Sequence, residues 1–405
     1  MDNANEGRVH MQKQKISIII ANTLDHFDSN LYGFIAPIMA PLFFPKQEPI
    51  VQLILAYSFL ATSSITRPLG VIICDWLAST YSPLNILIMT LLGVGICTVA
   101  TGFLPTFEIV GYFAPLLLLL IRFLMGIFAA GEKSIAGLYL IEGQKSKHAV
   151  VTNAWFESTV ILGCALASWV AMYVSKDNWR LPFFLGGVLA FYALSLRYKN
   201  FSVNVGAYQN VPIKGGLKFS RILLLIFSGG LSYVTYDMSF ILMNTFVPMI
   251  TKISFHTMMG WNTALLVFDM LLFIPIGYVI RKLDLQVSFI KKSSALMLGL
   301  PAIVLFHFMQ DTSLFYVLMV RFWIVMWGIV FSCVMQVHLA ELFPYRRKYL
   351  WIGLGTMIGS TLIGRSTSAI CLWGFYKTNL AVIPGVYLSV VSLMVWILCS
   401  KRLNA

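Results

Sequence analysis

Residues 16–43 read ISIIIANTLDHFDSNLYGFIAPIMAPLF, an apolar run that contains two aspartates, Asp25 and Asp28. A helix needs about 20 apolar residues to cross the hydrocarbon layer of a membrane, which is about 30 Å thick. A charge near the centre of such a helix costs about 2.5 kcal/mol or more. Charges that persist at this cost usually line a polar cavity. The run therefore predicts part of a path through a membrane for something small and polar.

Similar runs continue along the chain, which is 59% hydrophobic and 11% charged, whereas soluble domains are about 25% charged. We therefore predict an all-α membrane protein with about twelve transmembrane helices in two six-helix halves. The predicted spans are 16–43, 51–74, 84–104, 112–141, 148–174, 180–197, 221–250, 258–281, 289–309, 312–343, 349–373 and 381–400.

The basic residues are distributed unevenly between the loops. The net charge of +13 alone suggests an anionic partner such as nucleic acid, but most of the 29 lysines and arginines lie in alternate loops and the two termini. This asymmetry follows the positive-inside rule and predicts that both termini are cytoplasmic. We expect the lipid bilayer and a small molecule as partners, and no nucleic acid.

The sequence indicates no metal or cofactor site. The six cysteines have no paired spacing. The stretch 126–134 matches a phosphate-binding loop only superficially, because Glu132 is inserted in it and it lies within a span. We therefore predict that the protein is no enzyme and needs no cofactor.

The longest polar connection divides the chain. We predict an N-terminal half over 1–197, a cytoplasmic linker over 198–220 and a C-terminal half over 221–405. Three features recur about 200 residues apart in matching spans, which indicates a duplicated six-helix unit. These features are Pro68-Leu69-Gly70 with Pro275-Ile276-Gly277, Glu142 with Glu341, and Asp28 with Asp237.

Polar residues share one face of the first span. Asp25, Asp28, Ser29 and Tyr32 are spaced at i, i+3, i+4 and i+7. Two carboxylates near the middle of a membrane predict a proton or cation site, so Asp25 and Asp28 are our proton-coupling candidates. In the structural alternative, one acid pairs with an arginine and the other faces a wet vestibule.

Arg122 is the only arginine in the fourth predicted span. An arginine within a membrane needs a partner, and we expect this partner to be Asp25 or Asp28. Arg122 either binds a substrate carboxylate bidentately or exchanges its salt bridge when a proton arrives. The alternative is a permanent structural ion pair. We expect acids and arginines of both halves to converge in one central chamber.

Further charges lie in other spans. Glu132 follows Arg122 in the fourth span, and the adjacent Lys133 could pair with Glu157 in the fifth. Asp237 and Arg321 occupy positions equivalent to Asp28 and Arg122, which predicts either a charge set in the cavity or a pair that fixes two helices. Aromatic side chains that could stack on a quaternary ammonium, or simply pack between helices, are Trp155, Tyr236, Trp323 and Trp327.

Five segments are similar to motifs of one carrier family. Residues 22–37 are similar to G-N-x-x-E-W-Y-D-F-x-x-Y-G, with Asp25 in place of the glutamate and His26 in place of the tryptophan. The other four are residues 67–70 (R-P-L-G), 122–132 (R-x-x-x-G-x-x-x-x-G-E), 179–183 (W-R-[IVL]-P-F) and 339–344 (x-A-E-L-F-P). As a set they resemble the metabolite:H+ symporter family of the major facilitator superfamily, which contains proline/betaine and dicarboxylate symporters. The resemblance implies the major facilitator fold and proton-coupled symport of a small zwitterionic or carboxylate metabolite by a monomer in the bacterial inner membrane.

The resemblance and the charge pattern together give the predicted site. The substrate-binding or salt-bridge residues are Asn22, Tyr32, Arg122, Glu132, Trp155, Glu157, Tyr236, Asp237 and Arg321. The gating residues are Arg67, Gly70, Glu142 and Glu341.

Several positions depart from the family, among them Met125 in place of a glutamine, Glu157 in place of an amide and Thr356-Met357 in place of a tyrosine-asparagine pair. One whole segment departs as well. The family has a cytoplasmic G-D-R-x-G-R-[RK] loop that gates alternating access, but the stretch 78–84 here contains neither its acid nor its basic residues. The alternative function is therefore a transport-deficient, carrier-derived membrane receptor or scaffold.

Overall fold

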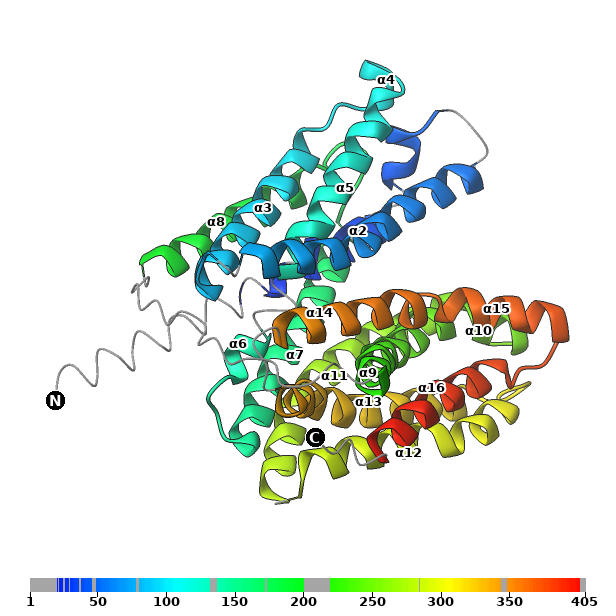
Figure 1. The fold of residues 1–405 in the computed structure, drawn as a ribbon. Helices are drawn as coiled ribbons and strands as arrows, with labels where there is room; N and C mark the ends of the chain where they lie inside the picture. The colour runs from blue at the N-terminus through cyan, green and yellow to red at the C-terminus, as the bar shows by residue number, and fades with distance from the viewer. Residues whose placement is uncertain are drawn as a thin grey trace. The chain divides into compact units, whose positions relative to one another are not determined.

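The structure is a computed structural model, and it describes residues 20, 22–24, 26–28, 30–35, 38–45, 49–77, 80–131, 137–171, 173–199, 219–283, 285–343 and 348–400. All regular elements in these residues are helices (Figure 1). Among them, 8 helices are long and apolar enough to cross a membrane. The chain is therefore a multi-pass membrane protein.

The helices follow the predicted spans closely. The described residues between 20 and 43 are helical where the first span is predicted. Each later span contains one helix or consecutive helical segments, which confirms the predicted all-α membrane architecture. In chain order the elements are α2 (Pro49–Leu77), α3 (Pro83–Phe103), α4 (Phe107–Val110), α5 (Phe113–Gly131), α6 (Gly137–Ile141), α7 (Ser146–Ala171), α8 (Leu181–Lys199), α9 (Phe219–Asp237), η2 (Met238–Leu242), α10 (Met243–Ile250), α11 (Phe255–Lys282), α12 (Val287–His307), α13 (Leu314–Leu342), α14 (Lys348–Gly359), η3 (Ser360–Gly364), α15 (Thr367–Thr378) and α16 (Ile383–Ser400).

Serine caps fix the starts of three spans. The hydroxyl oxygens of Ser82, Ser254 and Ser313 each accept a hydrogen bond from the backbone N–H three residues later, at the starts of α3, α11 and α13. These bonds satisfy N–H groups that have no partner within the helix. In α3, Pro83 follows the cap, where its fixed φ suits the first turn.

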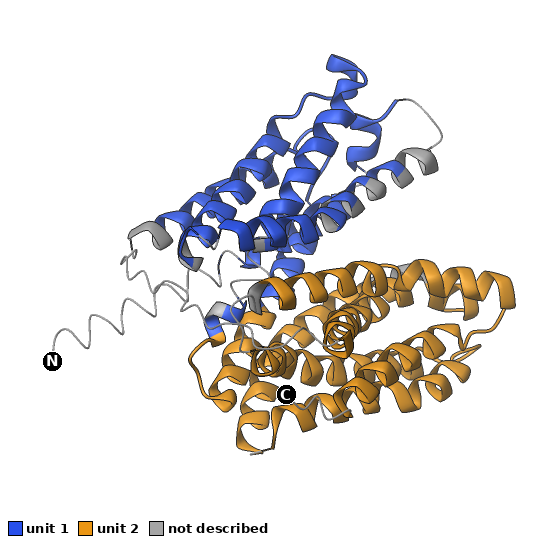
Figure 2. Ribbon diagram, viewed as in Figure 1, with its two compact units in different colours: residues 1–140, 159–209 blue, residues 141–158, 210–405 orange. Residues whose placement is uncertain are grey.

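The chain forms two compact units (Figure 2). Unit 1 comprises residues 1–140 and 159–209, and unit 2 comprises residues 141–158 and 210–405. Helix α7 is therefore divided, with its first part in unit 2 and the rest in unit 1. Most of the predicted linker, residues 200–218, lies outside the described residues.

In unit 1, α2 packs along α5, and α3 packs against both α5 and α8. Gly70 makes the first contact possible: a Cβ atom at this position would lie 2.2 Å from the carbonyl oxygen of Ile127. Only a glycine lets the two backbones approach so closely. The R-P-L-G motif thus brings α2 against the helix that carries Arg122.

In unit 2, α12 packs against α13 and α16, while α9 packs against α14 and α16. Two π-helical segments, η2 and η3, interrupt the seventh and eleventh predicted spans. A wider helical turn misaligns the backbone bonds near it. Hydroxyl groups compensate at η3: Ser366 and Thr367 donate to the Ile363 carbonyl at 3.2 Å each, and Tyr387 donates to it at 2.6 Å. The segment is therefore stabilised by its own polar neighbours.

Candidate functional site

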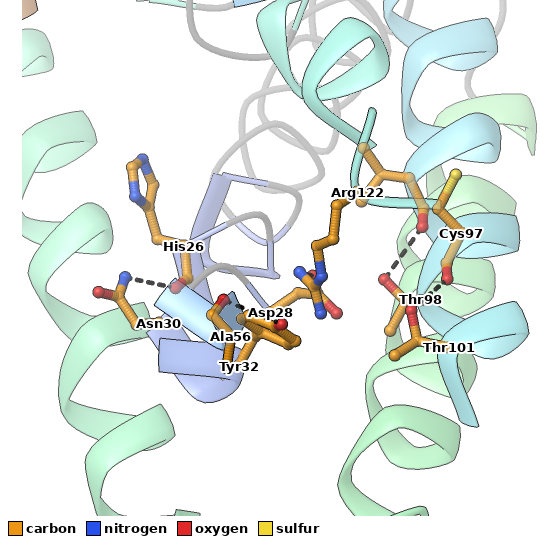
Figure 3. Close-up of polar contacts among 10 residues, drawn as sticks. His26, Asp28, Asn30, Tyr32, Ala56, Cys97, Thr98, Thr101 and Arg122 are labelled. Carbon is orange, nitrogen blue, oxygen red and sulfur yellow. Dashed lines mark hydrogen bonds and ion pairs between the residues drawn. The ribbon is translucent and has the colours of Figure 1, made fainter. Parts of the chain in front are cut away.

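A buried ion pair joins the first span to α5 in unit 1. The Nη1 atom of Arg122 lies 3.3 Å from Oδ2 of Asp28, and the two side chains are 1% and 3% exposed (Figure 3). The sequence predicted this pairing, because an arginine inside the membrane needs an acidic partner. Breaking a buried pair by removing one partner typically costs about 3–5 kcal/mol. The pair is thus a strong constraint on how the first span packs against α5.

Tyr32 completes the environment of the arginine. The Cζ atom of Arg122 lies 3.9 Å from the centre of the Tyr32 ring, a separation that favours a cation–π interaction. The Tyr32 hydroxyl donates to the carbonyl of Ala56 at 3.2 Å (Figure 3). Asp28 and Tyr32 meet the same guanidinium, which confirms that they share a helix face, as their spacing of four residues predicts.

Helix α3 supplies a third side of this site. The Thr98 hydroxyl lies beside the Asp28 carboxylate and also donates to the Val94 carbonyl at 3.0 Å. Thr98 is not among the site residues that the sequence predicts. A single hydroxyl in an apolar span usually bonds to its own helix, so its spacing carries no signal for a role at the ion pair.

The ion pair leaves polar groups of both partners unused. Nε and Nη2 of Arg122 and Oδ1 of Asp28 are buried without a hydrogen-bond partner among the described residues. Each such group costs about 1–3 kcal/mol when it is desolvated and unpaired. Nε and Nη2 lie on one edge of the guanidinium, and that edge binds a carboxylate through two parallel N–H···O bonds. Arg122 therefore holds Asp28 with one nitrogen, and its bidentate edge has no partner among the described residues.

Asn22 connects the first span to α7. It is fully buried, and its Nδ2 donates to the Thr159 hydroxyl at 2.8 Å. One turn beyond Thr159 in α7, a Cβ atom on Gly163 would lie 2.4 Å from the carbonyl oxygen of Thr23, the residue after Asn22. Asn22, which the sequence predicts as a substrate-binding residue, thus lies at a close contact between the first span and α7.

The equivalent acid in unit 2 has hydroxyl and amide donors. Asp237 is 4% exposed, and its Oδ2 accepts hydrogen bonds from the backbone N–H of Ser368 at 3.1 Å and from the Ser368 hydroxyl at 2.5 Å. Arg365 acts on this carboxylate electrostatically and lies 5.1 Å from the ring centre of Tyr233. The Tyr236 ring packs 5.9 Å from that of Tyr233. Asp237 therefore binds the start of α15, directly after η3.

The equivalent arginine in unit 2 has an amide partner. Arg321 of α13 is fully buried, and its Nη2 donates to Oδ1 of Asn262 in α11 at 2.5 Å. Its Nε and Nη1 have no hydrogen-bond partner among the described residues. Asn262 was not selected from the sequence, because a single asparagine near the start of a span carries no signal for its partner.

The other predicted site residues have varied surroundings. Glu157 of α7 is half-buried and lies close enough to Asp269 of α11 for their charges to interact. Trp155 is 44% exposed. Three residues lie outside the described part of the chain: Asp25, Glu132 and the expected Glu157 partner Lys133.

The predicted gating residues lie near helix ends or at helix contacts. Arg67 is buried in α2, one turn before Gly70. Glu142 is exposed in the turn after α6. Glu341, at the end of α13, accepts a hydrogen bond from the hydroxyl of Ser146, the first residue of α7. This last bond joins the x-A-E-L-F-P motif to the start of the fifth predicted span.

The known proteins to which this chain is similar are membrane transporters. Residues 15–199 match the family model described as "Sugar (and other) transporter". The glycine betaine/proline/ectoine/pipecolic acid transporter OusA of Dickeya dadantii is 30% identical over 197 residues. That alignment covers 46% of this chain and only 39% of OusA.

Other alignments extend over nearly the whole chain. The proline/betaine transporter of Escherichia coli K12 is 23% identical over 418 residues, covering 95% of this chain and 82% of the relative. The solved structure of the fucose:proton symporter FucP of E. coli superposes with a TM-score of 0.74 at 10% identity, covering 96% of this chain and 98% of that one. The structural likeness establishes the fold, and the sequence likeness is to transporters rather than to enzymes.

Proposed function

We propose that this chain is a secondary active transporter of the major facilitator superfamily that couples uptake of a small carboxylate-bearing metabolite to proton entry. The proposal places it as a monomer in the bacterial inner membrane, with both termini in the cytoplasm. The observation that carries it is the Asp28–Arg122 pair, in which the bidentate edge of a buried guanidinium has no partner among the described residues.

The open edge of Arg122 supports a carboxylate as the recognised group. A carboxylate placed there would accept from Nε and Nη2, and so satisfy two buried donors at once. The names of the relatives point to zwitterions such as proline and betaine, each of which carries one carboxylate. A dicarboxylate is the second substrate class that fits the same edge.

Asp28 is the proposed coupling group. When Asp28 is ionised, it holds Nη1 of Arg122 and neutralises the arginine. When Asp28 takes up a proton, the arginine loses its counter-charge, and a substrate carboxylate can replace it. Proton and substrate therefore favour each other at this site, as symport requires. Departure of both restores the original ion pair.

An uptake assay in proteoliposomes tests the proposal. The purified protein is reconstituted and supplied with radiolabelled proline, betaine and succinate, with and without an inwardly directed proton gradient. We expect one of these compounds to accumulate above equilibrium only with the gradient, and a protonophore to abolish the accumulation. Protein-free liposomes are the control. Equal accumulation with and without the gradient would exclude proton coupling.

The same assay addresses the alternative function. The stretch 78–84 lacks the charges of the family's gating loop, so a carrier-derived receptor or scaffold is the second candidate. Substrate binding to the purified protein, without uptake of any compound into the proteoliposomes, would favour that alternative.

A further inference from the structure

The guanidinium of Arg122 has a neutral partner as well as an acidic one. We propose that Tyr32 is a positioning residue, which keeps the guanidinium of Arg122 at the site while Asp28 is protonated. In this role Tyr32 acts through Arg122, without touching the substrate. The contact between the ring and the arginine belongs to the geometry of unit 1, whereas its use during transport rests on the proposed function.

Protonation of Asp28 leaves Arg122 as a buried charge without its counter-ion. The arginine side chain is 1% exposed, and among the described residues its ion pair is with Asp28. An arginine does not lose its own proton in a protein. A buried charge whose partner is removed is strongly destabilised, so a guanidinium with no other partner would move towards water or another acid. A site that awaits a substrate carboxylate therefore needs a second group to hold the arginine.

The ring of Tyr32 meets this requirement. Cζ of Arg122 lies over the ring, 3.9 Å from its centre, and an aromatic ring attracts a cation within about 6 Å. Tyr32 is fully buried, and a cation–π interaction is strongest where the two groups are desolvated. The attraction comes from the quadrupole of the ring, which is the same whether or not Asp28 carries a proton.

The position of the ring does not depend on Asp28. The Tyr32 hydroxyl donates to the backbone carbonyl of Ala56 in α2 at 3.2 Å (Figure 3). Tyr32 also belongs to a buried apolar cluster that includes Ala56 and Leu118. Leu118 lies in α5, one turn before Arg122. The ring is therefore held by α2 and by the helix that carries the arginine, as well as by its own span.

Tyr32 and Asp28 contact different parts of the guanidinium. Asp28 binds Nη1 at 3.3 Å, whereas the ring lies against the central carbon atom. Nε and Nη2 have no hydrogen-bond partner among the described residues, so the ring leaves open the edge that suits a carboxylate. The ring can therefore hold the arginine both before and after a substrate carboxylate binds.

NMR spectroscopy of protein with isotope-labelled arginine, in lipid nanodiscs, tests this role without any substrate. The Nε–H signal of Arg122 is identified by its absence from Arg122→Lys. A proton above the face of an aromatic ring is shifted upfield. We therefore expect Tyr32→Leu to move the signal downfield, and Tyr32→Phe, which keeps the ring and loses only the bond to Ala56, to leave it upfield.

The decisive comparison uses Asp28→Asn, whose side chain is neutral like that of the protonated acid. We expect the upfield signal to persist in Asp28→Asn and in Asp28→Asn/Tyr32→Phe, and to be lost in Asp28→Asn/Tyr32→Leu. Thermal unfolding verifies that each variant is folded. If a leucine variant does not fold, Tyr32→Met replaces it, because methionine is flexible and fills irregular space without a ring.

Unit 2 offers a matched control. Cζ of Arg365 lies 5.1 Å from the ring centre of Tyr233, a contact of the same kind with another arginine. Tyr233→Leu should therefore leave the Arg122 signal at its wild-type position. This control separates the effect of the Tyr32 ring from a general effect of replacing a tyrosine by leucine.

Two results would overturn the inference. One is loss of the upfield signal in Asp28→Asn alone, because the ionised acid would then be the group that keeps the arginine over the ring. The other is an upfield signal that persists in Tyr32→Leu, because the ring would then not be its origin.

Substrate counterflow separates the inference from the proposed function. In the Asp28→Asn background, Tyr32→Phe should change the KM of counterflow by less than about threefold. Tyr32→Leu should raise it about thirtyfold, which corresponds to the loss of a desolvated cation–π interaction of about 2 kcal/mol. Equal KM values in the two double variants would exclude Tyr32 from the transport cycle. If the wild-type protein transports no compound, the proposed function fails, and the NMR result still decides whether Tyr32 positions Arg122.

Discussion

The two halves of the sequence carry an acid and an arginine at equivalent positions, but the two pairs are organised differently. In unit 1, Asp28 and Arg122 bind each other at 3.3 Å. In unit 2, Asp237 is bound by Ser368, while Arg321 is bound by Asn262. A proton can dissolve an ion pair, whereas it has far less effect on hydrogen bonds to neutral partners. The duplicated residues have therefore diverged in their partners: unit 1 keeps a direct ion pair, whereas in unit 2 each residue is hydrogen-bonded to a neutral one.

The largest expected effect comes from neutralising Asp28, the acid of the unit 1 pair. Asp28→Asn leaves the guanidinium of Arg122 buried without its counter-charge, and we expect proton-driven accumulation to fall to the level of protein-free liposomes. Counterflow of substrate, which needs no net proton movement, should stay measurable. Both are measured in the same proteoliposomes. Accumulation equal to that of the wild type would remove Asp28 from coupling.

Replacing each arginine by lysine sharpens the comparison. Lysine keeps the charge but lacks the planar pair of donors, so Arg122→Lys should weaken binding of a carboxylate substrate by about tenfold to a hundredfold, since a bond to a charged group contributes about 1.5–3 kcal/mol. Isothermal titration of the purified protein with the transported compound measures the change.

Arg321→Lys is the matched control, because Arg321 is engaged by a neutral amide. It should lower thermal stability and leave affinity within about threefold. Equal losses of affinity in the two lysine variants would show that the arginines have the same role.

Gly70 and Gly277 occupy equivalent positions in the repeated motif, so replacing each of them compares the helix packing of the two units. A Cβ atom at Gly70 would lie 2.2 Å from a backbone oxygen, which cannot move alone, whereas one at Gly277 would lie 2.6 Å from the Cβ of Ala154. We expect Gly70→Ala to destabilise by about 1–3 kcal/mol and Gly277→Ala by less. Thermal unfolding in detergent measures both. A larger loss for Gly277→Ala would contradict this ranking.

Much of this architecture could be predicted from the sequence because the membrane imposes strict requirements. A spanning helix must be apolar over about 20 residues, so the helices follow the apolar runs. A buried arginine must find an acid, so the sequence narrows the partner of Arg122 to Asp25 or Asp28, and the structure shows that it is Asp28.

The remaining contacts follow no such rule. Ser368 and Asn262 are neutral residues of ordinary types, and nothing in their spacing identifies them as partners of Asp237 and Arg321. Glu157 and Asp269 carry like charges, and a search for opposite charges does not bring two acids together. The π-helical segment η3 is contacted by the hydroxyl of Tyr387, which follows Ile363 by 24 residues. These features depend on tertiary packing, which local sequence does not encode.

The smallest expected effect tests the comparison from the side of unit 2. In Asp237→Asn the new amide oxygen can still accept from the N–H and hydroxyl of Ser368, so most of the local bonding is kept. The variant loses the attraction between Asp237 and Arg365, and its bonds from Ser368 no longer involve a charged acceptor. We expect these two losses to lower the free energy of unfolding by about 1 kcal/mol. Proton-driven accumulation should therefore stay within about threefold of the wild type. If Asp237→Asn instead abolishes accumulation while sparing counterflow, as expected for Asp28→Asn, then both acids take part in coupling, and the different partners of the two pairs do not reflect different roles.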